Sequence, residues 1–447
     1  MRSKYKFYTS ILVLVLFTAF WCTKPFTNTK SIATPKKVYS KKIEGHFQLF
    51  KNNKPFYIRG TAGEPLFKEL AAMGGNTLRL YDTINLKRNL IEAEKYGISI
   101  IVDIPIPRYN DDYNPYANES NNNLLKKEVR TLVRNYKKYP ALLLWNLGNE
   151  VEFPFVLIKN KFIYTFNELI DIIHDEDPDH PVSTAINSGS RRQTLSIYWH
   201  APNLDIAAYN IFGNLKNLKS VISKISYITG RDMPYYISEW GANGPWEEAN
   251  TIWKAPIEPT TTKKGEQYRE IYNTYIATDP NCSGSLAFYW GQKQERTQTW
   301  FNIFDEKTRK NQTFYELRSI WKHIAVPQDS LPHIKYMLVD NKGSRDQLIF
   351  TPNDVKTAEL LLTSKLDSTL QFEWEIRPEA WYYKEWDLEK NPQTIEGSTF
   401  KNSDSKIIFT IPKLEGPYRI YVQVNDQNGN FAAANTPFYV LKSPYEE

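Results

Sequence analysis

The sequence predicts an α/β protein, a (β/α)8 TIM barrel followed by a C-terminal all-β sandwich of immunoglobulin-like type. Three observations lead to this prediction. Short apolar segments alternate with longer amphipathic stretches up to about residue 326. Beyond that point, period-two segments are separated by Gly, Asn, Asp and Pro. The length of 447 residues is also too great for one ordinary hydrophobic core.

The predicted barrel strands are nearly continuous apolar runs, as expected for a parallel sheet that is covered on both faces. Eight such runs occur in order, at residues 55–60, 76–81, 98–105, 141–150, 181–186, 204–210, 235–241 and 284–291. Eight repeated strand-helix units close naturally into a barrel.

The predicted helices carry apolar residues at intervals of three and four. Clear examples are residues 66–73, 86–97, 124–139, 162–175 and 264–277, and a last helix over 312–324 closes the barrel. We therefore assign residues 44–326 to the barrel and 327–447 to the sandwich, which we interpret as an accessory domain. The aromatic stretch EAWYYKEW in the sandwich, residues 379–386, could stack on sugars, but a core or interdomain contact is the favoured interpretation.

The first 22 residues have the layout of an export signal, with a basic start and an apolar stretch from Ile11 to Trp21. Cys22 lies where a lipoprotein cysteine would, although the bulky Trp21 precedes it. A cleaved signal, a lipid anchor and a retained membrane anchor all stay open, and residues 23–43 are predicted to be a solvated tether. We expect an extracytoplasmic protein that is secreted or anchored to the membrane or cell surface.

Charge and cysteine usage exclude several classes of function. The formal net charge is +6, but nine Lys and Arg residues precede the first acid, Glu44, and subtracting them leaves −3 for the remainder. A nucleic-acid partner is therefore not expected. After Cys22 only Cys282 remains, which excludes an intramolecular disulfide. The six histidines show no metal-ligand spacing, so we expect no metal and no organic cofactor.

Two predicted strands end in a glutamate, and the carboxyl ends of barrel strands form the functional face of this fold. Strand four ends in Asn149-Glu150, and strand seven contains Ser238-Glu239. Two carboxylates facing each other at a barrel mouth are the minimum requirement for cleaving a glycosidic bond.

On these motifs the sequence resembles the retaining (β/α)8 glycoside hydrolases that carry the acid/base on strand four and the nucleophile on strand seven. It is most similar to the catalytic barrel of glycoside hydrolase family 2, with echoes of β-1,3-glucan-acting families. The matching segments are NKPFYIRGTA, GGNTLRLYDT, LLLWNLGNEVE, YYISEWGANG and LAFYWG, followed by the stretch over residues 299–321. The resemblance covers about residues 44–325.

The resemblance implies roles for individual residues. Glu150 matches the general acid/base and Glu239 the nucleophile, whereas Glu152 is a lower-ranked rival for Glu150. Substrate-binding roles are implied or expected for Asn149, Arg79, Asn210, Trp290, Trp240 and Asp82, with Trp290 as the floor of the sugar subsite.

The resemblance also contains one departure. The family places a tyrosine whose hydroxyl bonds the nucleophile where this sequence has Phe212, and Tyr209 is expected to point the opposite way. We further expect Arg79 to favour the ionised form of Glu239, and a raised pKa for Glu150.

Other polar and aromatic residues are weaker candidates. Residues following the first three strands could bind hydroxyls or form ion pairs: Glu64, Asp103 and Arg108. Aromatic residues expected in loops on the active face could stack on sugars: Trp199, His200, Trp246 and Trp300.

The leading hypothesis is a retaining β-glycosidase that hydrolyses O-glycosidic bonds of poly- or oligosaccharides with two glutamates. A β-glucan transglycosylase and a catalytically lapsed carbohydrate-binding barrel are the alternatives. The expected partner is a carbohydrate, with a membrane tether through the N-terminus as a further expectation.

Overall fold

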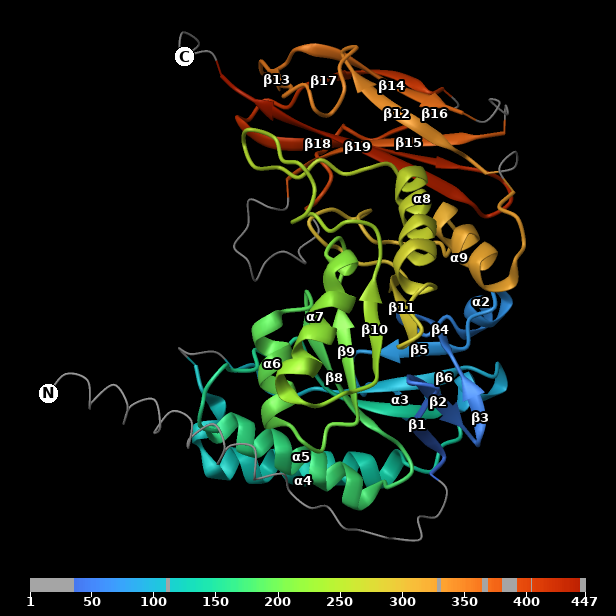
Figure 1. Ribbon diagram of the computed structural model, residues 1–447. Helices are drawn as coiled ribbons and strands as arrows, with labels where there is room; N and C mark the ends of the chain where they lie inside the picture. Colours follow the sequence, from blue (N-terminus) through green and yellow to red (C-terminus); the bar gives the residue numbers. More distant parts are fainter. Residues whose placement is uncertain are drawn as a thin grey trace, which may run out of the picture. The chain divides into compact units, whose positions relative to one another are not determined.

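The computed structural model describes residues 36–109, 113–327, 331–363, 369–379, 392–402 and 404–442 (Figure 1). The described residues from 37 onward belong to one compact unit. The predicted export signal and residues 380–386 of the aromatic stretch lie outside the described residues. Within the described ranges, no helix is both long and apolar enough to cross a membrane.

Parallel strands form a closed barrel in chain order, so each strand pairs with its sequence neighbours and the last pairs with the first. They are β4 (Ile58–Gly63), β5 (Thr77–Leu80), β6 (Ser99–Ile104), β7 (Leu142–Asn149), β8 (Val182–Asn187), β9 (Ile206–Asn210), β10 (Tyr235–Trp240) and β11 (Cys282–Trp290). Each overlaps one predicted segment, and the predicted barrel is confirmed.

Helices surround these strands and bury their apolar faces against them. They are α2 (Phe67–Ala72), α3 (Leu86–Lys95), α4 (Glu119–Tyr136), α5 (Lys161–Glu176), α6 (Arg191–His200), α7 (Leu215–Thr229), α8 (Thr261–Ile271) and α9 (Gln312–Lys322). Helix α4 begins earlier than predicted because the side chain of Asn118 caps it, accepting hydrogen bonds from the Ser120 and Asn121 amides.

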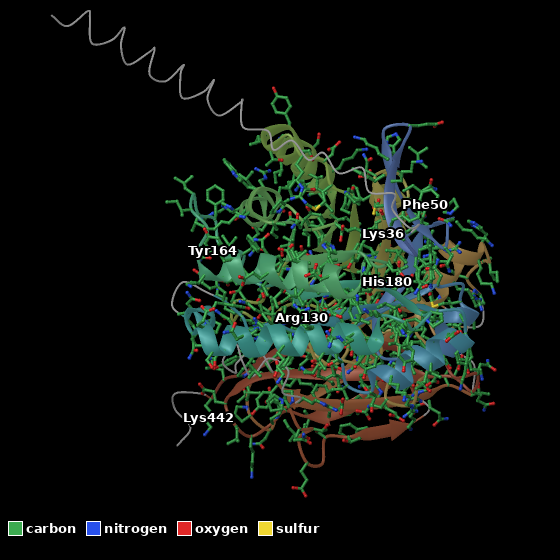
Figure 2. All side chains as sticks on the ribbon, turned by 90° about the horizontal axis from the view of Figure 1, so that it is seen from below. Lys36, Phe50, Arg130, Tyr164, His180 and Lys442 are labelled. Carbon is green, nitrogen blue, oxygen red and sulfur yellow. The ribbon has the colours of Figure 1, made fainter. Side chains whose placement is uncertain are left out.

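Helices α4 and α5 lie side by side, with Arg130 on one and Tyr164 on the other (Figure 2). Arg130 donates to Glu176 at the end of α5, at 2.9 Å. Helix α6 corrects one expectation. Trp199 and His200 are its last residues and do not belong to a loop on the active face.

A small antiparallel sheet precedes the barrel, formed by β1 (Val38–Ile43), β2 (His46–Lys51) and β3 (Lys54–Phe56). Glu44 and Gly45 make its first turn, both with positive φ, at 49° and 86°. Val38 is buried, and its amide donates to the Asp179 carbonyl oxygen. The last six residues of the predicted tether therefore form a strand, since Val38 has an apolar site to occupy.

The C-terminal residues form two β-sheets, as predicted. One contains β12 (Ile334–Val339), β14 (Val355–Leu362) and β17 (Lys406–Thr410), and the other contains β13 (Ile349–Phe350), β19 (Phe431–Val440), β18 (Gly416–Asn425), β15 (Gln371–Pro378) and β16 (Phe400–Asn402). Alternate residues of these strands build a separate apolar core that includes Trp374, Val422 and Phe438. This is the layout of a β-sandwich.

Buried polar contacts join the sandwich to the barrel. Arg419 of β18 is fully buried and donates to the Pro256 carbonyl oxygen at 2.6 Å. Asn435 of β19 donates to Glu258 at 2.7 Å. Pro256 and Glu258 belong to the segment that joins β10 to α8, so the sandwich holds a barrel loop in place.

Candidate active site

Polar side chains from several barrel strands meet at the carboxyl ends of the strands. The residues that take part are Arg79 from β5, Asp103 from β6, Asn149 and Glu150 at the end of β7, Asn210 from β9, and Glu239 from β10. Their hydrogen bonds connect them into one network. Of the site residues predicted from the sequence, Arg79, Asn149, Glu150, Asn210 and Glu239 are thus brought together.

Arg79 is the centre of this network and is fully buried. Its guanidinium binds Asp103 through two bonds, of 3.0 and 2.7 Å, and also donates to Glu239 Oε1 at 3.0 Å. Burial alone would lower the pKa of Arg79, but Asp103, Tyr81 and Glu239 raise it well above its usual value. Arg79 is therefore a permanent positive charge between two acids.

Asn210 links this arginine to Glu150. Its oxygen Oδ1 accepts from Arg79 at 3.1 Å and from Ser238 at 2.7 Å. Its nitrogen Nδ2 donates to Asn149 at 3.0 Å and to Glu150 Oε1 at 2.8 Å. These four bonds use the whole capacity of the amide. Asn210 was expected to bind substrate, but its geometry is that of a residue that positions Glu150 and Arg79.

Within the described part of the chain, only the side-chain oxygen of Asn149 takes part in the network. Its oxygen Oδ1 accepts from Arg79 Nη2 at 2.7 Å as well as from Asn210. With the oxygen fixed in this way, the amide N–H₂ group can donate to a hydroxyl of a bound ligand.

Glu150 follows β7 in a left-handed backbone conformation, with φ of 51°. A non-glycine residue in this region is uncommon, and such residues gather at functional sites. The chain reaches it through Gly148, whose φ is 76° and where a Cβ atom would lie 2.9 Å from Val151 Cγ1. Glu152 is exposed in the following loop, whereas Glu150 contacts the network through Asn210. The structure thus favours Glu150 over its rival.

Glu239 is 6% exposed and accepts a hydrogen bond from the Tyr81 hydroxyl at 2.8 Å. Burial raises the pKa of Glu239 to about 8, and Glu150 adds to this effect, whereas Arg79, Tyr81 and Lys293 oppose it. Arg79 does favour the ionised form of Glu239, as expected, but desolvation outweighs this ion pair and the net pKa of Glu239 is raised. Burial and the neighbouring Glu150, opposed by Arg79, Tyr81 and Lys293, leave Glu239 as a group that exchanges protons near neutral pH.

Tyr81 is the site residue that sequence reasoning missed. Phe212 does lack the expected hydroxyl, but Tyr81 supplies one from another strand. Burial and the charge of Glu239 raise the pKa of Tyr81 well above its usual value, so its hydroxyl keeps its proton and donates. The available signal was spacing, since Tyr81 lies two residues after Arg79 and such residues share a face of a strand. Tyr209 packs its ring against Tyr235 instead.

A second layer of polar residues supports the network from within the barrel. Asn146 donates to Asp103 at 2.9 Å, and Ser183 donates to Asn146 Oδ1 at 2.9 Å. The Ser183 hydroxyl also lies 3.0 Å from that of Tyr236. These side chains are fully buried and fix the position of the Asp103–Arg79 pair.

Similar proteins were found by sequence and by structure. No protein-family model matches the chain. A mannan endo-1,4-β-mannosidase F from Aspergillus clavatus is 21% identical over 258 residues, which cover 49% of this chain and 56% of that protein.

Among solved structures, the β-glucuronidase 2 of Bacteroides uniformis, covalently bound to cyclophellitol-6-carboxylate aziridine, has a TM-score of 0.50 and 14% identity over 91% of this chain and 48% of its own. The β-glucuronidase of Ruminococcus gnavus has a TM-score of 0.50 and 14% identity, over 65% of this chain and 53% of its own.

The chain resembles glycoside hydrolases. The resemblance drawn from the sequence is thereby confirmed, as is the fold of a barrel followed by a β-sandwich. The chain spans about half the length of these glycoside hydrolases.

Trp290 does not lie where the glycoside hydrolase resemblance places it. It is fully buried and packs against Phe304 and Phe314 at ring distances of 4.6 and 6.1 Å, with its indole N–H donating to the Leu66 carbonyl oxygen. A register shift between Phe288 and Trp290 breaks the simple alternation of β11. Trp290 is therefore a core residue in this structure and not the floor of a subsite.

Trp240 and Asp82 also lie outside the network. Trp240 is fully buried against Tyr268 and Tyr272, because it follows Glu239 directly and adjacent strand residues face opposite sides. Asp82 is exposed and accepts a hydrogen bond from the Ile84 amide, which is a turn contact.

The weaker candidates are spread over different environments. Glu64 accepts from the Gln292 amide, and Asp103 is the partner of Arg79 already described. Trp300 is buried and donates to the Asn243 carbonyl oxygen. Trp246 is 57% exposed beside Phe212. Arg108 is exposed. Among the described residues, no three His, Cys, Asp or Glu side chains gather as a metal site would require.

Proposed function

We propose that the protein is a retaining β-glycosidase that hydrolyses O-glycosidic bonds of poly- or oligosaccharides. The observation that carries this proposal is the joint positioning of Glu150 and Glu239, which share the network of Asn210 and Arg79. The electrostatic effect of Glu150 on Glu239 is consistent with two carboxyl groups close enough to act on one bond.

In the first step, a carboxylate oxygen of Glu239 attacks the anomeric carbon. The bond to the leaving oxygen breaks, and Glu150 gives its proton to that oxygen. In the second step, Glu150 takes a proton from a water molecule, whose oxygen attacks the anomeric carbon and releases Glu239. The Tyr81 hydroxyl and Arg79 both donate to Oε1 of Glu239, which holds the carboxylate in position for attack through Oε2.

The protonation state of Glu239 bears on this mechanism. The raised pKa of Glu239 keeps it largely protonated at pH 7. The attacking form needs that proton removed, and the departing oxygen needs a proton from Glu150. Ionisation of Glu239, which Arg79 and Tyr81 favour, is therefore part of the proposed first step.

The proposal can be tested with a panel of aryl β-glycosides, β-mannans, β-glucans and β-glucuronides. The similarity to a mannosidase suggests the mannans, and the similarity to β-glucuronidases suggests the glucuronides. We expect a fluoro-sugar inhibitor to label Glu239 and the product to keep its anomeric configuration. Glu150→Ala should keep measurable activity on aryl glycosides with good leaving groups, because these need no proton donor, whereas Glu239→Ala should lose it. Hydrolysis that survives in both variants would contradict the proposal.

The same panel separates the alternatives. Sugar transfer products in place of hydrolysis would indicate a transglycosylase. Binding without turnover or labelling would indicate a lapsed barrel, which Phe212 had made plausible. The hydroxyl supplied by Tyr81 favours an active site over a lapsed one.

We also propose that the chain is exported and lies outside the cytoplasm, either secreted or tethered through its N-terminus. This proposal comes from the sequence of residues 1–22. Cell fractionation, combined with mass spectrometry of the mature N-terminus, distinguishes a cleaved signal, a lipid on Cys22 and a retained anchor. Recovery of the protein in the cytoplasmic fraction would contradict the proposal.

A further inference from the structure

Trp246 is a large aromatic side chain that is 57% exposed, in the segment that follows Glu239 and β10. One face of its indole lies over Gly244, where an added Cβ atom would be 2.4 Å from Cε2 and 2.5 Å from Cζ2 of the indole. A side chain at position 244 would therefore push the ring away. Gly244 leaves the ring room to lie flat against the backbone.

The other contacts of Trp246 are aromatic. Its ring meets Phe212 edge to face at 5.7 Å and Phe301 at 6.2 Å. Both of these rings contact Phe288, at 6.0 and 5.2 Å, and Phe288 in turn contacts Tyr81 at 6.4 Å. We call these five residues the aromatic wall. It runs from the hydroxyl that binds Glu239 to an exposed indole.

The segment around Trp246 is fixed by contacts that do not involve the exposed part of the indole. The Glu247 carboxylate accepts from the backbone amides of Gly213 and Gly244, both at 2.9 Å. Farther along, Thr251 and Ala255 bond to each other through their backbones. The loop thus holds the indole in one place, and its exposed surface is not used to hold the loop.

An exposed, fixed aromatic ring next to a carbohydrate site has an evident use. Flat apolar rings stack on the faces of sugar rings, and ligand sites are lined mainly by aromatic side chains with a few polar groups. Phe288 and either Phe212 or Phe301 lie between Tyr81 and Trp246 along the aromatic wall. The Trp246 indole is therefore placed to contact a sugar ring other than the one bound at Glu239.

We propose that Trp246 is a specificity residue that stacks on a second pyranose ring of the substrate, one not bonded to Glu239. The site is then built for a carbohydrate chain of at least two sugars and not for a single sugar. This inference rests on the proposed glycosidase function and assigns to it a class of substrate.

The test compares hydrolysis of an aryl monoglycoside with that of β-linked oligosaccharides of increasing length. We expect Trp246→Ala to lower kcat/KM for oligosaccharides by about tenfold, or about 1.4 kcal/mol, relative to the monoglycoside. The loss should lie mainly in KM, and Trp246→Phe should recover part of it. Gly244→Ala should act in the same direction, because it displaces the indole without removing it.

Trp199→Ala is the matched control. Trp199 is 50% exposed, comparable to Trp246, but it lies near the C-terminal end of α6. A helix that follows a barrel strand runs back toward the amino ends of the strands, away from the site. This variant should keep the selectivity for chain length.

The outcomes separate the inference from the proposed function. If the wild type hydrolyses oligosaccharides and Trp246→Ala keeps their preference over the monoglycoside, the inference is wrong and the glycosidase proposal stands. If the wild type turns over no substrate, the glycosidase proposal fails, and calorimetric binding of the same oligosaccharides decides the inference. Weaker binding by Trp246→Ala would support it, whereas equal binding, or none by the wild type, would overturn it.

Discussion

The Tyr81 hydroxyl and the Arg79 guanidinium donate to the same oxygen of Glu239, Oε1, at 2.8 and 3.0 Å. Both donors stabilise the ionised form of this carboxyl group, and burial opposes them. The reactivity of Glu239 is therefore set by a balance that one hydroxyl can shift.

Tyr81→Phe should shift that balance toward the protonated acid. Loss of the hydrogen bond raises the pKa of Glu239 above its value of about 8. Since Glu239 attacks as a carboxylate in the proposed mechanism, the acidic limb of the kcat/KM profile should move to higher pH, and the rate at pH 7 should fall by about tenfold. Tyr227→Phe, which removes a hydroxyl from an exposed tyrosine, is the control. An unmoved acidic limb would show that Tyr81 does not tune Glu239.

Glu239→Gln should change how stability depends on pH. The pKa of Glu239 is raised from 4.5 to about 8 in the folded protein, so the folded state holds the proton more tightly than the unfolded state. The wild type therefore loses stability as the pH rises from about 4.5 to about 8. Glutamine resembles the protonated acid and avoids this loss, which amounts to about 3–5 kcal/mol. Urea unfolding should show similar stabilities near pH 4.5 and a more stable variant above pH 8.

Asn210→Ala should damage both activity and stability. It removes four hydrogen bonds, which takes an acceptor from the Ser238 hydroxyl and one partner each from Arg79, Asn149 and Glu150. We expect unfolding to become easier by about 1–3 kcal/mol and kcat/KM to fall by about a hundredfold. Asn187→Ala is the matched control, because Asn187 is exposed and makes one bond of 3.2 Å to Glu150. Equal effects of the two variants would contradict the central position of Asn210.

Trp290→Phe tests whether this residue belongs to the core. A smaller ring between Phe304 and Phe314 leaves space unfilled, so the melting temperature should fall. The KM of the folded variant should stay that of the wild type, since the indole is fully buried. A rise in KM with no loss of stability would restore Trp290 to the sugar subsite.

Arg419→Ala tests the contact between barrel and sandwich. Arg419 is fully buried and binds Glu379, Asn435 and the Pro256 carbonyl oxygen. Its removal leaves Glu379 buried without this partner and should cost about 3–5 kcal/mol. Calorimetry should show one transition at lower temperature, because the two domains share this contact. Two separate transitions already present in the wild type would contradict that coupling.

The barrel could be predicted because its strands are buried on both faces and therefore stand out as apolar runs. The placement of Glu150 and Glu239 followed from the same rule, since the fold itself brings the carboxyl ends of parallel strands together. Arg79 and Asn149 joined them for the same reason.

The orientation of individual rings could not be predicted in this way. The Trp290 side chain points into the core because of a local register shift in β11. No pattern in the sequence predicts this shift. Nor could the pKa of Glu239 be predicted from its neighbours, because the degree of burial depends on how the whole barrel mouth packs. Tyr81 was within reach of a spacing argument, which would have paired it with Arg79.

The contact between Arg419 and Pro256 makes the β-sandwich a structural support of the barrel. The segment from β10 to α8 carries Trp246 near its start and, near its end, Pro256 and Glu258, which the sandwich holds. A gene fragment that stopped at residue 326 would keep the predicted catalytic glutamates but release one end of this loop. For protein engineering, the unit that can be moved to another protein is therefore the barrel together with its sandwich.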